Sequence, residues 1–299
     1  MMTRHGEIVG GIVTVPDLDL ALADYQGRLG LRLIEQALLD AVLAASWGCP
    51  ASAGSRMAVL QPTSGAHCFI RLIEQPLPAA FVPTTSFGWA AYELTVLDVF
   101  GWPARIAGGG FSIVGEPKEI PGLPYFVAMQ IHGPGKEMLY LNETRSNTPS
   151  SDLPVAQSPV DHLFIVILAA PDRVGAVAWY KQALGLDEGE TYVIEYSMIN
   201  NAFGLPAGTT SGLTMIQNAR MPIVEIDEYP AQTLVRPCEQ GWLPPGNALV
   251  SLAVRSLEEC HCEWIVPPAV HSGALYGGAR SATTLGPAGE LLELVELAR

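Results

Sequence analysis

Hydrophobic and polar positions in the first part of the chain follow a strand–helix–three-strand order. Residues 8–15 form an apolar run interrupted by a glycine pair, which predicts a buried strand. Pro16 and Asp17 suit the first turn of a helix with an apolar face, and Gly30 suits its left-handed end. Three extended runs follow, at residues 31–34, 56–61 and 68–74. The pattern predicts one β-α-β-β-β unit.

The same order restarts at residues 89–96, where apolar and polar positions alternate around Glu93. This alternation predicts a strand with one exposed face. A short helix is expected over residues 99–106, ending at the glycines 108–110. That glycine run follows a helix and lacks the lysine of a phosphate loop, so it is interpreted as a turn and no nucleotide cofactor is expected. Extended runs complete a second unit at residues 111–114, 125–131 and 137–141.

The second half of the chain repeats the first. Pro16-Asp17 recurs as Pro171-Asp172, and Leu29-Gly30-Leu31 recurs as Leu184-Gly185-Leu186, each 155 positions later. Residues 133–141 likewise match residues 286–294 without a gap. A repeat of this kind indicates a tandem duplication. The predicted fold class is therefore α+β, with four β-α-β-β-β units.

A polar, proline-rich connector at residues 146–159 separates the two halves. Its position predicts an N-terminal domain over residues 1–145 and a C-terminal domain over residues 160–299. Each domain is expected to contain two consecutive units. At 299 residues the chain also has about the length of two domains.

Composition and charge exclude several kinds of partner. The formal net charge is −14 without a basic stripe, which argues against nucleic acid and anionic membranes. No apolar run reaches the roughly 18 residues of a membrane helix. Five scattered cysteines and the absence of a signal-peptide pattern favour a reducing cytoplasm. We expect a cytoplasmic monomer or homodimer whose partner is a small molecule.

The strand that opens the second half, residues 160–167, begins with a histidine in an otherwise strongly β-forming run. Such a strand would hold the His162 imidazole rigidly, as a metal ligand or a proton carrier requires. The alternative is a strand-end histidine that bonds a backbone carbonyl.

Four such units, with D-x-x-x-A…Y…LGL after each half's first strand and G-P-x-G-E-L-L-E-L at the end, resemble the vicinal oxygen chelate superfamily. That superfamily includes glyoxalase I, extradiol dioxygenases, methylmalonyl-CoA epimerase, and bleomycin- and fosfomycin-resistance proteins. The resemblance implies units paired into two cupped-sheet domains, in which the first and last strands supply ligands to a divalent metal. It does not fix the reaction, because one fold hosts many chemistries.

Carried over residue by residue, the resemblance implies a metal site in the C-terminal domain. His162, Glu225 and Glu293 match ligand positions, whereas the fourth position falls at Leu249 and breaks the pattern. The N-terminal domain keeps no ligand, so it is expected to be structural or to bind an organic ligand. Its corresponding positions are Gly10, Arg71, Ala91 and Tyr140.

An imidazole and two carboxylates suit iron, manganese, zinc or nickel with open coordination positions. The metal would polarise a substrate oxygen, and Glu293 and His162 would carry out the catalytic steps. The predicted function is a metal-dependent lyase or isomerase acting on an oxygen-rich or aromatic metabolite. One alternative is a metal-free binding protein of the resistance type. The other is an extradiol dioxygenase-like oxidoreductase, which needs a second histidine near Leu249.

Further residues are candidates for substrate contact. Arg280 is able to anchor a carboxylate, with a surface role as the alternative. His271 is a candidate replacement for the missing ligand. Cys260-His261-Cys262, in an expected short helix, is interpreted as packing because no second ligand pair accompanies it. The candidate substrate contacts are Arg280, His271, Tyr276, Phe203 and Tyr229.

Overall fold

The computed structural model describes residues 3–120 and 123–297, and it contains the four expected units. Unit 1 consists of β1 (Ile8–Val15), α1 (Leu18–Gly27), β2 (Arg32–Leu38), α2 (Ala41–Ser46), β3 (Arg56–Gln61) and β4 (Phe69–Glu74). Unit 2 consists of β5 (Gly88–Val96), α3 (Trp102–Ile106), β6 (Ser112–Ile120), β7 (Leu123–His132) and β8 (Met138–Thr144).

Units 3 and 4 follow after a connector at residues 145–159 that carries no helix or strand. Unit 3 consists of β9 (Val160–Ala170), α4 (Arg173–Leu184), β10 (Asp187–Ile194), α5 (Ser197–Phe203), β11 (Ser211–Asn218) and β12 (Met221–Glu228). Unit 4 consists of β13 (Asn247–Val254), β14 (Ala269–Val270), β15 (Arg280–Leu285) and β16 (Leu291–Glu296). Three single 3-10 turns lie at Pro50–Ser52, Val99–Gly101 and Leu257–Glu259.

The long helices begin and end largely as the sequence predicts. Asp17 and Asp172 cap α1 and α4 by accepting hydrogen bonds from the backbone N–H groups of Leu20 and Gly175. Gly185 ends α4 in the left-handed conformation with φ 64°. The helix expected around Cys260 is wrong, because the 3-10 turn of unit 4 ends at Glu259. No helix within residues 3–120 or 123–297 combines the length and apolar character that crossing a membrane requires.

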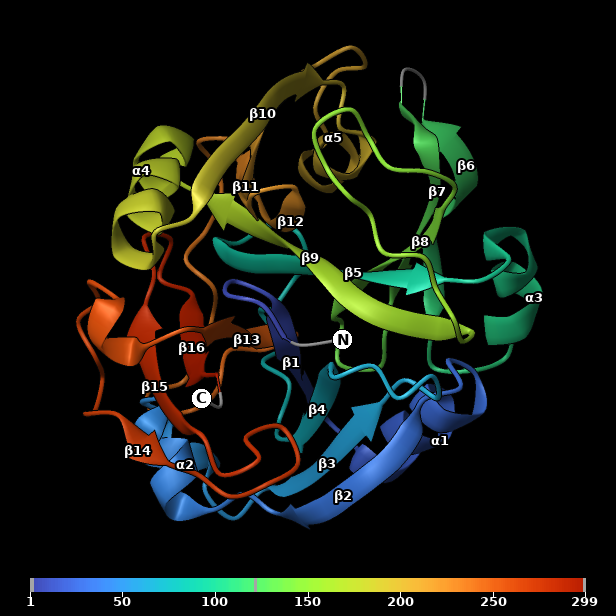
Figure 1. Ribbon diagram of the computed structural model, residues 1–299. Coiled ribbons are helices and arrows are strands. Elements are labelled where there is room, and N and C mark those ends of the chain that lie inside the picture. Colours follow the sequence, from blue (N-terminus) through green and yellow to red (C-terminus); the bar gives the residue numbers. More distant parts are fainter. Residues whose placement is uncertain (1–2, 121–122, 298–299) are drawn as a thin grey trace.

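The two sheets do not follow the two sequence halves. One eight-stranded sheet has the order β14-β15-β16-β13-β1-β4-β3-β2, and the other has the order β10-β11-β12-β9-β5-β8-β7-β6 (Figure 1). The expectation that each half forms its own cup is therefore wrong. β1 pairs with β13 and β5 pairs with β9, both antiparallel, so unit 1 joins unit 4 and unit 2 joins unit 3. We name these sheets cup I (units 1 and 4) and cup II (units 2 and 3).

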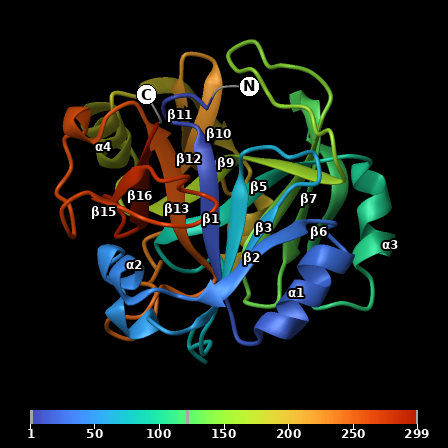
Figure 2. The ribbon, with the colours of Figure 1, turned by 60° about the horizontal axis from the view of Figure 1, so that its bottom comes forward.

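The two sheets pack against each other through one shared core, seen from a second side in Figure 2. Tyr92 of β5 reaches across this core, where its hydroxyl donates to the carbonyls of Ile12 and Leu249. A side chain at Gly11 would meet the Tyr92 ring at 2.7 Å, which explains the glycine that interrupts the first strand. Two smaller clusters of buried apolar side chains line the interiors of the cups.

Two buried tyrosine–glutamate pairs link a helix of one sheet to a hairpin turn of the other. Tyr25 of α1 donates a 2.7 Å hydrogen bond to Glu137, in the turn between β7 and β8. Tyr180 of α4 donates a 2.9 Å bond to Glu290, in the turn between β15 and β16. Burial raises the pKa of both carboxyl groups to about 7. These repeat-equivalent pairs therefore connect the cups and titrate near neutral pH.

The paired glutamates should make the free energy of unfolding fall as the pH rises. Their folded-state pKa lies above the unfolded value, so the stability gained by protonation is present at low pH and is lost as the pH approaches 7. In urea titrations between pH 5 and 8, the double variant Glu137→Gln/Glu290→Gln should show a smaller fall in the free energy of unfolding. The difference should be up to about 3 kcal/mol for each glutamate removed. The exposed Glu119→Gln is the control, and an unchanged slope in the double variant would contradict the assignment.

Candidate functional site

The interior of each cup is centred on residues of the first and last strands of its units. The parallel register places Ile12 beside Arg71 and Ser251 beside Glu293 in cup I. It places Glu93 beside Tyr140 and Ile167 beside Glu225 in cup II. The first-strand positions expected from the resemblance are therefore displaced along their strands. The positions are occupied by Ile12, Glu93, Ser251 and Ile167. The first three lie two residues after the expected Gly10, Ala91 and Leu249, and Ile167 lies five residues after the expected His162.

Cup I contains a buried ion pair between Arg71 and Glu293, whose charged atoms approach to 2.9 Å. Both side chains are almost fully buried, at 2% and 0% exposure. Glu293 also accepts hydrogen bonds from Trp47 at 2.9 Å and Tyr276 at 2.8 Å, and from Ser251. The Arg71 guanidinium in turn lies 5.0 Å from the centre of the Trp47 ring.

This network neutralises the Glu293 carboxylate at the centre of cup I. Burial alone would raise the pKa of Glu293, but the Arg71 charge and the three donors hold it below its usual value. Glu293 is thus a permanently charged structural group, whereas the sequence predicted a metal ligand and catalytic residue. A divalent cation does not fit here, because the guanidinium already lies against both the carboxylate and Ser251.

The interior of cup II brings together the carboxyl groups of Glu93, Glu225 and Asp227, and among the described residues none of them has a cationic partner. Glu93 accepts a hydrogen bond from the Asn142 amide, and Glu225 accepts one of 3.1 Å from the Tyr196 hydroxyl. Asp227 follows Glu225 on the same face of β12 and is 1% exposed. None of the three takes part in a salt bridge within the described residues.

Each carboxyl group of cup II binds its proton more tightly than usual. Burial raises the pKa of Glu225, although the Tyr196 hydroxyl and Asp227 partly oppose the rise. Burial, and then the charge of Glu225, raise the pKa of Asp227 well above its ordinary value. The same two causes act on the pKa of Glu93. Carboxyl groups that repel one another in a low dielectric hold their protons more tightly than isolated groups do, and their titrations are coupled.

Aromatic side chains surround these carboxyl groups. Tyr140 and Tyr229 are buried in the interior, and Tyr140 shares a 3.1 Å hydrogen bond with the hydroxyl of Tyr196. Phe203 packs edge-on against Tyr229, with ring centres 6.0 Å apart. Tyr196 and Glu225 are only half-buried, so solvent reaches the cup beside them. The polar centre of cup II therefore comes nearest to solvent at Tyr196, just before α5, and at Glu225.

The structure does not bring the three predicted metal ligands together. Glu225 belongs to cup II and Glu293 to cup I. His162 lies at the start of β9, where its ring is half-exposed and 3.3 Å from Asp161. The single C-terminal site fails because the two units of the C-terminal half, units 3 and 4, lie in different sheets.

The predicted substrate contacts are divided between the cups in the same way. Tyr276 packs near His271 in cup I and bonds Arg71 and Glu293, whereas Phe203 and Tyr229 line cup II. Arg280 lies apart from both polar centres and pairs with Glu258 and Glu296.

The residues of cup II likewise decide whether a divalent metal fits there. Carboxylate and amide oxygens suit a hard cation, and the buried Asn142 Oδ1 and Asp227 Oδ1 atoms lack a hydrogen-bond donor. Within residues 3–120 and 123–297, however, no three His, Cys, Asp or Glu side chains converge on one point as metal ligands must. The residues as placed therefore do not fit the metal that the resemblance implies.

Sequence reasoning missed Glu93, Asn142, Asp227 and Tyr196. The alternation around Glu93 was visible, but it was interpreted as a strand with an exposed face. All nine residues of β5 are buried, because the polar face lines cup II instead of meeting solvent. The i, i+2 spacing of Glu225 and Asp227 was a usable signal for two carboxyl groups on one strand face.

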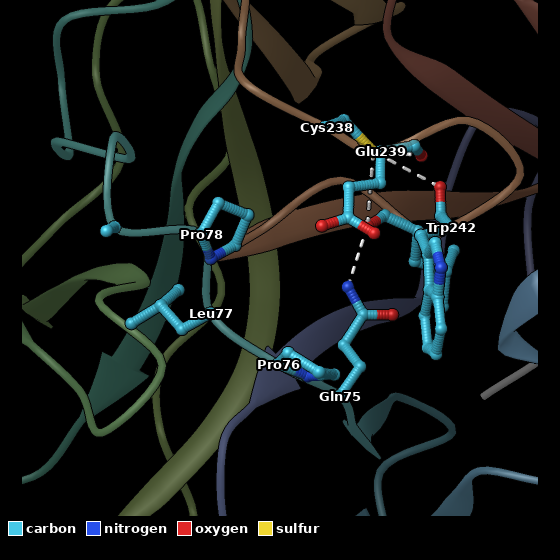
Figure 3. Close-up of a pocket in the computed structure, with 9 residues that line it drawn as sticks. Gln75, Pro76, Leu77, Pro78, Cys238, Glu239 and Trp242 are labelled. Carbon is cyan, nitrogen blue, oxygen red and sulfur yellow. Dashed lines mark hydrogen bonds between the residues drawn. The ribbon is translucent and has the colours of Figure 1, made fainter.

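A pocket of about 260 Å³ lies outside the cup interiors, between the end of β4 and the loop before β13 (Figure 3). Its polar groups bond one another, as when Gln75 donates to the Leu243 carbonyl at 2.7 Å. Cys238 is its one nucleophilic side chain, and burial raises the pKa of that thiol. A protonated thiol is a poor nucleophile, so the pocket offers no catalytic group comparable with those of cup II.

Removal of Arg71 should destabilise the fold strongly. Arg71→Gln leaves the Glu293 carboxylate buried without its cation, which should cost about 3–5 kcal/mol of unfolding free energy. Arg71→Gln/Glu293→Gln should cost at least about 2 kcal/mol less than the sum of the single variants, because it removes both charges. Urea unfolding at pH 7 gives the free energy of unfolding of the unmodified protein, the two single variants and the double variant. Additive losses would show that the pair is not coupled.

Comparison with known proteins supports the fold and not a reaction. No family model and no curated protein matches the chain. Glyoxalase I from Zea mays is similar in structure, with a TM-score of 0.62 and 16% identity over 97% of this chain and 92% of that chain. A putative dioxygenase from Bacillus subtilis has a TM-score of 0.61 and 10% identity over 99% of this chain and 87% of that chain. The chain therefore has the fold expected from its resemblance to the vicinal oxygen chelate superfamily, with four units paired into two cupped sheets.

Proposed function

We propose that this protein is a small-molecule lyase or isomerase that moves a proton on a carbonyl compound inside cup II, without a metal ion. The observation that carries the proposal is the set of carboxyl groups Glu93, Glu225 and Asp227, which are buried together without a cation. Strongly perturbed ionisable groups gathered in an accessible cup are typical of catalytic sites.

In this proposal Glu225 is the base. It is the half-buried member of the group, whereas Glu93 and Asp227 are buried, and its raised pKa brings it closer to neutral pH. A base of that strength removes a proton next to a carbonyl group more effectively than an ordinary carboxylate does. The Tyr196 hydroxyl donates to Glu225 Oε1 and fixes the orientation of the carboxylate.

Asp227 is the acid. Burial and the neighbouring charge of Glu225 raise its pKa well above the usual value, so it holds its proton more tightly than an ordinary carboxyl group does. A protonated carboxyl group is able to donate a hydrogen bond to the oxygen that becomes negative when the substrate loses its proton. Two carboxyl groups on one strand face thus divide the roles of base and acid, as their different environments dictate.

The other functions considered from the sequence have weaker support. The metal-dependent version relied on His162, Glu225 and Glu293, which lie in different places. The dioxygenase version needs two histidines beside a carboxylate, and no such group occurs in the described part of the chain. The metal-free binding version shares cup II with our proposal and differs from it only in turnover.

Hydrogen–deuterium exchange tests the reaction without knowledge of the natural substrate. The protein is incubated in D2O with a panel of 2-oxoaldehydes, α-hydroxyketones and α-aminoketones, and NMR follows the hydrogen beside the carbonyl. We expect the protein to accelerate exchange for at least one class, and Glu225→Gln to slow that exchange by about 100-fold or more. A chelator should have no effect.

The matched control is Glu228→Gln, on the same strand but with an exposed side chain that should not affect exchange. Absence of accelerated exchange across the panel would contradict the proposal. So would a Glu225→Gln variant as active as the unmodified protein, or a loss of exchange on chelation.

A further inference from the structure

We propose that cup II recognises a small organic cation, a protonated amine whose ammonium group lies among the carboxyl groups of β5 and β12. This inference rests on the proposed function, since it names the substrate class of the same cup: a carbonyl compound that also carries an amine. It depends on three features of cup II that cup I lacks.

The first feature is uncompensated acidity. In cup I the single carboxylate of Glu293 is matched by the guanidinium of Arg71. The Arg236 guanidinium, in the loop between β12 and β13, acts on the pKa of Tyr229, but its N–H groups are already donated to the Ser86 hydroxyl and the carbonyls of Trp89 and Asn247. The protein therefore supplies no cation of its own to the carboxyl groups of cup II within the described residues.

The second feature is a pair of buried acceptors without donors. Asn142 and Asp227 are each 1% exposed, and the Oδ1 atom of each has no hydrogen-bond partner in the described residues. The Asn142 amide donates its N–H to Glu93, which places this side chain next to the acidic cluster. Buried acceptors left unpaired are costly. An ammonium group carries three donors and no acceptor, which is what such a site lacks.

The third feature is the aromatic lining. Tyr196 donates to Glu225, Tyr140 bonds the Tyr196 hydroxyl, and Tyr229 belongs to the same buried cluster as Tyr140. Phe203 extends this wall through its contact with Tyr229. Aromatic faces attract organic cations and also accept the carbon skeleton that an amine carries. An inorganic ion would gain little from this lining.

Calorimetric titration compares benzylammonium with benzyl alcohol, which has the same ring and a neutral hydroxyl group. We expect benzylammonium to bind at least about tenfold more tightly at pH 7.5. Titration in two buffers of different ionisation enthalpy should also show proton release, because a neighbouring cation favours the ionised form of Glu225, the base. Benzyl alcohol should release none.

Two variants locate the site. Asp227→Asn and Glu225→Gln should abolish the preference for the cation and the proton release, and the exposed Glu228→Gln should retain both. Equal affinity for the two ligands would overturn the proposal, and so would a preference that survives both variants. Displacement of benzylammonium by magnesium or manganese at similar concentration would also overturn it, in favour of an inorganic cation site.

The outcome is separable from the proposed reaction. Deuterium exchange without cation preference would support the proposed reaction and contradict the proposal that its substrate carries an amine. Cation preference without exchange would leave the binding site in place and make the protein a binding protein instead of an enzyme.

Discussion

The desolvation of carboxyl groups inside two curved sheets is the constraint on which the rest of this structure depends. A carboxylate removed from water needs a cation, several donors or a proton. Cup I uses Arg71, Ser251, Trp47 and Tyr276 around Glu293, and the result is a closed and charged structural centre. Cup II has three carboxyl groups and no cation, so protons or a ligand must neutralise them. The two cups of one duplicated fold thus differ, because cup I is centred on a complete ion pair and cup II on carboxyl groups with raised pKa values.

The pairing of units explains why the two centres lie where they do. Because β1 pairs with β13 and β5 with β9, each cup combines strands from both halves of the sequence. The tyrosine–glutamate pairs then link the cups through helices and turns of opposite sheets. The geometry of cup II therefore depends on the packing of both halves of the chain, and neither half contains a complete cup.

The sequence predicted the units, their order and the duplication, because hydrophobic periodicity and turn residues are local signals. It did not predict which units share a sheet, because that choice depends on long-range strand pairing. The first-strand positions were predicted wrongly for the same reason, since their register also depends on long-range strand pairing. Glu93 faces the cup two residues after the expected Ala91, and His162 lies at a strand end. A period of two cannot tell a face that meets solvent from a face that lines a polar cup.

The pH dependence of stability in Glu225→Gln and Glu293→Gln tests the central claim most directly. Between pH 5.5 and 9, unfolding free energies are compared with the unmodified protein. The raised pKa of Glu225 means that its ionisation costs stability as the pH rises, so Glu225→Gln should become more stable relative to the unmodified protein. The lowered pKa of Glu293 means that its contribution is already complete above pH 5.5, so the deficit of Glu293→Gln should stay constant. Parallel curves for the two variants would contradict the distinction between a neutralised cup and a proton-sharing one.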